Sequence, residues 1–152
     1  MLAVACTPDE DKNPVDASKG KMLMHGSWQL SDYRYTPDIA AEVPVTMDYY
    51  TPLPGCQKDD YMIFNSGSLV SKYQGLTKCS INDPDSIVYN YSLEQDEKFL
   101  RIWGNPDDPE NSVLMAGDIT YPDVRTFIIT YLATNPTDEE LTSRHTLTFT
   151  KQ

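Results

Sequence analysis

The chain is poor in positive charge, histidine and cysteine, and each shortage narrows the functions open to it. Its 152 residues contain 12 Lys+Arg against 23 Asp+Glu, for a formal net charge of −11, with 2 histidines and 3 cysteines. Such an acidic chain lacks the basic face that nucleic-acid phosphates require, so we expect no nucleic-acid partner. The histidines are far from the cysteines in sequence and no C-x-x-C spacing occurs, so we expect no metal site and no cofactor.

Motifs for catalysis are also missing. Nucleophilic catalysis needs a histidine within reach of a serine or cysteine. His25 lies at the end of a polar leader, and His145 shares a predicted strand face with Leu147 and Phe149, which is typical of a core or rim position. The neighbouring carboxylates Asp59 and Asp60 lie where a strand begins, and adjacent strand residues point to opposite faces. The sequence therefore predicts a protein that is not an enzyme and has no catalytic residues.

No apolar run approaches the roughly 20 residues of a membrane-spanning helix. The one suggestive run is Leu2–Ala5, which ends at Cys6 and is followed at once by polar residues. This pattern resembles the end of a bacterial lipoprotein signal peptide, in which the cysteine is lipidated. The resemblance implies a membrane anchor on Cys6 and a cell-envelope location, as an outer-membrane lipoprotein on the periplasmic face or the cell surface. The alternative is a disordered N-terminus with a chance cysteine.

Composition shifts near residue 23 and divides the chain into two parts. Residues 1–22 are interpreted as a truncated signal-peptide end and a flexible lipoprotein tether, because they carry prolines and charges without periodicity. Residues 23–152 form the predicted domain. If Cys6 is lipidated, Cys56 and Cys79 remain as an even pair, and in an exported protein this suggests a disulfide. Two unrelated thiols are the alternative.

The domain has the pattern of an all-β protein. Its 10 tyrosines and 11 prolines favour strands and turns, and period-two alternation begins at Ser27. We expect a short helical turn at 38–42 and about eight strands, mostly joined by short turns, at 27–35, 61–64, 69–73, 87–93, 99–103, 112–120, 127–132 and 143–150. This order favours an eight-stranded antiparallel up-and-down barrel, with a β-sandwich as the alternative.

Three motifs carry a family resemblance across residues 23–152. They are Gly26-Ser27-Trp28, the segment from Cys56 through Lys58-Asp59-Asp60 to Phe64-Asn65, and Lys78-Cys79. Together they resemble the small lipocalin-like lipoproteins of Bacteroidetes. The resemblance implies a calyx-like barrel, a Cys56–Cys79 bridge and a structural plug at Trp28, but no particular ligand. The chain departs from the pattern at Tyr91, where a tryptophan would be common.

The interior of such a barrel is either filled or just large enough for one small ligand. Strand alternation predicts that Leu69 points inward and Lys72 outward. The inward residues best suited to contact a ligand are Tyr89, Tyr91, Tyr131 and His145, whose rings combine apolar surface with a polar tip.

Two functions follow from these alternatives. The first is binding of a small apolar or amphipathic ligand in the barrel. The second is a non-enzymatic scaffold, interaction or inhibitor protein with a filled barrel, in which loops such as residues 49–53 contact an unknown protein partner.

Overall fold

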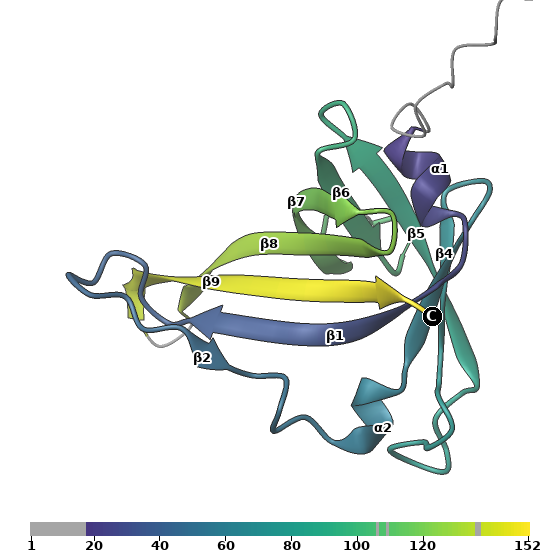
Figure 1. Cartoon of the computed structure of the whole chain (residues 1–152), viewed down its shortest axis with the longest axis horizontal. Coiled ribbons are helices and arrows are strands. Elements are labelled where there is room, and N and C mark those ends of the chain that lie inside the picture. The colour runs from purple at the N-terminus through teal and green to yellow at the C-terminus, as the bar shows by residue number, and fades with distance from the viewer. Residues whose placement is uncertain (1–17, 106, 109, 136–137) are drawn as a thin grey trace, which may run out of the picture.

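The computed structural model describes residues 18–105, 107–108, 110–135 and 138–152, so the predicted lipidation site Cys6 lies outside the described residues. Figure 1 shows strands that curve around a common centre, with two short helices at the periphery. The helices are α1 (Lys19–Leu23) and α2 (Gly55–Lys58). The strands are β1 (Ser27–Thr36), β2 (Met47–Asp48), β3 (Tyr61–Asn65), β4 (Leu69–Tyr73), β5 (Ser86–Glu94), β6 (Phe99–Trp103), β7 (Val113–Asp123), β8 (Thr126–Asn135) and β9 (Asp138–Lys151).

The strands form a closed antiparallel barrel, which confirms the predicted fold class. The sheet runs β2-β1-β3-β4-β5-β6-β7-β8-β9, and β1 also pairs with β9, so eight strands close on one another and β2 adds a short edge beside β1. Sequential strands are neighbours throughout the closed part. Closure removes the unpaired edges that an open sheet or sandwich would present.

A bulge in β1 extends its inward face. Leu30 pairs with Phe149, but the next aligned pair is Asp32 with Thr148, so Ser31 is an extra residue. An extra residue shifts the alternation by one position. Tyr33 consequently follows Leu30 on the inner side, and Tyr33 packs against the buried core. The bulge thereby brings a phenol into the barrel where uninterrupted alternation would place Asp32.

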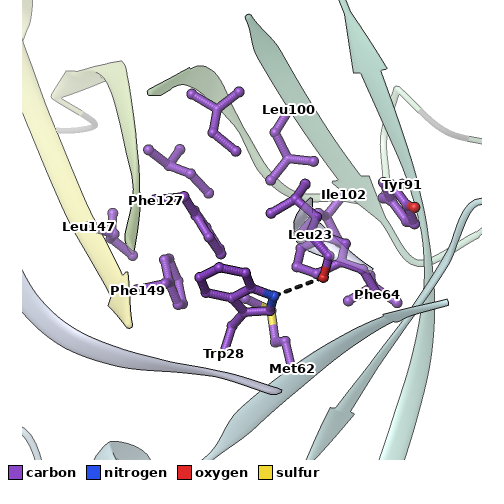
Figure 2. Close-up of a cluster of buried hydrophobic side chains, with 13 residues drawn as sticks. Leu23, Trp28, Met62, Phe64, Tyr91, Leu100, Ile102, Phe127, Leu147 and Phe149 are labelled. Atoms are coloured by element: carbon purple, nitrogen blue, oxygen red, sulfur yellow. Dashed lines mark hydrogen bonds between the residues drawn. The ribbon is translucent and has the colours of Figure 1, made fainter. Parts of the chain in front are cut away.

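One end of the barrel is closed by a tryptophan and a helix. Trp28 is fully buried, and its indole Nε1 donates a 2.8 Å hydrogen bond to the carbonyl oxygen of Leu23, the last residue of α1. Figure 2 shows the indole lying among Phe127, Phe149 and Met62; its ring centroid is 4.9 Å from that of Phe127. Every polar atom of the Trp28 side chain is satisfied while its surface is removed from water, so this end is dry and closely packed.

The helix α1 spans the predicted boundary at residue 22–23, with its first four residues in the segment predicted to be tether. Its Ser18 cap accepts from the backbone N–H of Lys21, and the backbone N–H groups of Lys19 and Gly20 donate to the Glu97 carboxylate in the β5–β6 turn. Leu23, the last residue of the helix, is fully buried. Tertiary contacts stabilise this short helix, which explains why the sequence of the segment shows no helical periodicity.

The predicted disulfide is confirmed. Cys56 lies in α2 and Cys79 in the connection between β4 and β5, with their Cα atoms 5.1 Å apart. A second tie fastens α2 to the barrel, because the Gln29 side-chain amide donates a 2.6 Å hydrogen bond to the Lys58 carbonyl. The proline-rich segment before β3 is therefore attached at both sides. The helical turn expected at 38–42 is not formed; those residues are bends and coil, and the helical turn lies at α2 instead.

The inward face of β4 differs from the prediction. Leu69 is 39% exposed whereas Val70 is fully buried. The register explains the difference: Phe64 pairs with Val70 and Met62 with Lys72, and cross-strand partners share a face. Lys72 consequently points to the inner side of the barrel.

Candidate functional site

A cavity of about 350 Å³ lies inside the barrel. Trp28, Met62, Leu147 and Phe149, all less than one-tenth exposed, form its inner part. Leu114, which is 52% exposed, and the exposed Gln57 lie at its outer part. The remaining lining residues are Leu30, Tyr33, Leu53, Asp60, Tyr61, Lys72 and Met115. The buried residues, Trp28 among them, form the floor of the cavity, and the exposed residues form its mouth at the opposite side.

The mouth is bordered by α2 and the segment that precedes it. Leu53 and Gln57 come from this segment, and the bridge from Cys56 to Cys79 holds it in place. The pairing of β1 with β3 ends at Gln29 and Tyr61, so α2 occupies the wall beyond the point where these two strands part. The disulfide thus positions residues that line the cavity, in addition to closing a loop.

An ion pair faces this mouth. Lys72 Nζ lies 3.0 Å from Asp60 Oδ2, and the side chains are 39% and 10% exposed. Asp60 Oδ1 also accepts a hydrogen bond of 3.3 Å from the backbone N–H of Gly75. Asp60 directly precedes β3 and lies two residues before Met62, so the two side chains share the inner face. Lys72 is the cross-strand partner of Met62 and shares this face too. The cavity is therefore apolar at its floor and carries one compensated pair of charges at its mouth.

The four residues predicted to contact a ligand occupy two separate places. Tyr131 and His145 are cross-strand partners whose rings stack at a centroid distance of 4.6 Å. Tyr91 is buried against Phe64 and its hydroxyl donates to the Asn65 carbonyl, while Tyr89 packs on the edge of the core. None of the four is among the residues that line the cavity.

Tyr131 and His145 belong to an aromatic cluster with Tyr33, Tyr35 and Tyr49. Ring centroids in this cluster are 4.6–6.0 Å apart. The Tyr49 ring packs on Tyr33 and Tyr35, so part of the 49–53 segment, whose loop is a candidate partner surface, lies against the barrel. Rings at these separations contribute about 0.5–1.5 kcal/mol per pair beyond their burial.

A chain of hydrogen bonds crosses this cluster. Tyr33 Oη lies 2.7 Å from His145 Nδ1, His145 Nε2 lies 3.3 Å from Ser143 Oγ, and Ser143 Oγ donates to the Ala133 carbonyl. A neutral imidazole with its proton on Nε2 satisfies all three contacts. Burial lowers the pKa of His145, which favours this neutral form. Burial, aided by the nearby Tyr131, raises the pKa of Tyr33 to about 12, so its hydroxyl keeps its proton and donates.

A second hollow, of about 720 Å³, lies where β7 and β8 part. Their pairing ends at Asp118 and Thr130, whereas β8 continues beside β9. The strands approach closely at the parting point, since a Cβ on Gly117 would lie 2.5 Å from the Thr130 carbonyl oxygen. The charged Asp118 and Arg144 line this hollow. It is an open surface feature and lacks the apolar floor of the interior cavity.

The described part of the chain contains no group of three or more His, Cys, Asp or Glu side chains that could hold a metal ion. Among the described helices, none has the length and apolar character needed to cross a membrane.

The mouth residues Asp60 and Lys72 were missed by sequence reasoning. The signal that could have identified Lys72 is its spacing of two from Val70, had the hairpin register been known.

Comparisons with protein-family models, with curated proteins and with solved structures found no match to this chain.

Proposed function

We propose that this chain is a cell-envelope lipoprotein whose lipocalin-like barrel binds one small apolar or amphipathic ligand. The observation that carries the binding proposal is the cavity of about 350 Å³ above Trp28, with its buried floor of apolar side chains. Ligand sites in proteins are concave, mostly apolar, and about 300–1,000 Å³ in volume, with a few polar groups that orient the ligand. The cavity is at the small end of this range, which suits a single chain or ring system.

The envelope part of the proposal is supported by cysteine usage. A disulfide such as Cys56–Cys79 is typical of proteins in an oxidising compartment. The residues before Cys6 resemble the end of a lipoprotein signal peptide, which would make a lipid on Cys6 the membrane anchor. Intact-mass measurement of the protein isolated from its own cell envelope tests this point. We expect a mature chain that begins at a lipid-modified Cys6. An unmodified Cys6 would contradict the anchor while leaving the cavity proposal unaffected.

Binding is tested by titrating an apolar fluorescent probe into the purified domain. Leu30→Trp places a large ring in the interior cavity, so we expect it to abolish probe binding. The matched control is Leu132→Trp, which makes the same change at the 58% exposed residue that lines the outer hollow. Loss of binding in the control variant alone would place the probe in the outer hollow and contradict the proposal. Circular dichroism of both variants verifies the β-rich fold.

A second candidate function, protein interaction, is favoured by the β4–β5 connection. Leu76 is fully exposed and Ile81 is 91% exposed, on the loop that Cys79 anchors. Aliphatic side chains presented on a constrained loop can serve as contacts for a partner protein. A scaffold of this kind does not need the interior cavity. If Leu30→Trp leaves the native partner of the protein bound while Leu76→Ser with Ile81→Ser releases it, the interaction function is favoured over ligand binding.

A further inference from the structure

The ion pair at the cavity mouth constrains what the cavity can hold. Both members face the inside of the barrel, where a charge is costly unless it is paired and hydrogen-bonded. A barrel that only needed filling would be served as well by apolar residues at positions 60 and 72. The pair lies at the junction between an apolar floor and solvent, which is where the polar group of an amphipathic ligand would emerge.

The hydrogen-bonding capacity of the pair is unequal. Asp60 uses Oδ1 for the backbone N–H of Gly75 and Oδ2 for Lys72. An ammonium group has three donors, and within the described residues Asp60 is the single polar partner of Lys72. Because Lys72 lines the cavity and its side chain is 39% exposed, its two other donors are open to solvent or to a ligand at the mouth. The pair therefore offers hydrogen-bond donors to a ligand more readily than acceptors.

We infer, resting on the proposed function, that the ligand is a neutral amphiphile: an apolar chain or ring system whose uncharged head group, such as an ester, amide or alcohol oxygen, accepts a hydrogen bond from Lys72. The Asp60 carboxylate already compensates the ammonium charge, so an uncharged acceptor binds without disturbing the pair.

Charged head groups are disfavoured at this mouth. An anionic head that used a remaining donor of Lys72 would lie beside the Asp60 carboxylate, whose side chain is only 10% exposed, and the two like charges would repel each other. The formal net charge of −11 adds a repulsion that acts on every anion. A cationic head would meet the Lys72 ammonium itself. The site therefore discriminates by charge among ligands that share one apolar body.

The test compares methyl decanoate, decanol, decanoate and decylamine as competitors of the apolar probe, at mildly alkaline pH where decanoate is ionised. For the unmodified protein we expect methyl decanoate and decanol to bind at least about tenfold more tightly than decanoate, because the Asp60 carboxylate beside Lys72 repels an anionic head group but not an uncharged one. Tightest binding by decanoate or decylamine would overturn the inference and leave the proposed function intact. Failure of the probe and all four compounds to bind would overturn both.

Two variants make the test specific to the pair. Asp60→Asn keeps the oxygen that accepts from Gly75 but leaves the Lys72 charge uncompensated, so we expect the preference to shift toward decanoate by about tenfold or more. Asp118→Asn removes the same charge from an exposed site on β7, and we expect it to leave the preference unchanged. Equal shifts in both variants would show that overall charge, rather than the pair, sets the preference, and would contradict the inference.

Discussion

The two ends of the barrel are built from different chemistry. At the closed end, Trp28 and Leu23 are fully buried and joined by a hydrogen bond, with aromatic rings packed around the indole. At the other end, inward-facing side chains include the Asp60–Lys72 ion pair and the Tyr33–His145 hydrogen bond. A closely packed apolar end stabilises the fold, whereas inward polar groups cost desolvation, and a few such groups are typical of ligand sites. This contrast places stability at one end and the proposed binding at the other.

The largest expected effect is at the closed end. Trp28→Ala should lower the free energy of unfolding by about 3–5 kcal/mol, because it removes a fully buried ring and leaves a cavity beneath α1. Denaturant titration measures the loss. Trp103→Ala is the matched control, since Trp103 is only partly buried on β6, and its loss should be clearly smaller. Equal losses, or a change within about 0.5 kcal/mol at Trp28, would show that the closed end does not have this role.

The disulfide gives the next largest expected effect, and its removal should change both the stability of the domain and the binding at the mouth. Its cysteines are 23 residues apart, and loss of a bridge closing a loop of that length costs about 3 kcal/mol. We expect the double variant Cys56→Ala, Cys79→Ala to lose that much stability by denaturant titration. Because α2 borders the cavity mouth, we also expect faster release of the apolar probe in stopped-flow measurements. Unchanged release would mean that the bridge does not position the mouth.

The closed end was more predictable from the sequence than the mouth. The plug role of Trp28 was implied by the family resemblance of its motif. The strands around it could be assigned by period-two alternation, since local patterns suffice where every inward residue is apolar. The bridge could be expected from the even number of remaining cysteines. The assignment of the strands uses residue type and short-range spacing, which can be read directly from the sequence.

The mouth depends on register, which the sequence does not state. A shift of one residue in a strand exchanges its two faces, and this is why Lys72 was predicted outward and Leu69 inward. The bulge at Ser31 has the same effect on Tyr33. The prediction of Tyr89, Tyr91, Tyr131 and His145 as ligand contacts rests on their aromatic rings and on the inward face that alternation gives them. In the structure, Tyr89 and Tyr91 lie in the packed wall of the barrel, whereas Tyr131 and His145 lie in the aromatic cluster. Alternation predicts which face of a strand a residue occupies, but not its position along the barrel axis.

The smallest expected effect is the pH dependence of the aromatic cluster. Burial lowers the pKa of His145 below its ordinary value of 6.5, so the unfolded chain takes up the proton first as pH falls. The stability that the neutral ring contributes is thus fully present above pH 6.5 and is lost as the pH falls below that value. We expect the free energy of unfolding to decline more steeply with acidification in the unmodified protein than in His145→Gln, as denaturant titrations across this range would show.

The matched control for this prediction is His25→Gln. His25 is exposed between α1 and β1, outside the aromatic cluster, so the same substitution there should retain the steeper decline of the unmodified protein. If His145→Gln and His25→Gln follow the same profile, the acid sensitivity belongs to the carboxylates rather than to the Tyr33–His145 contact. A difference confined to His145→Gln would show that the binding end, and not the plug end, responds to mild acid, because no titratable side chain takes part in the contact between Trp28 and Leu23.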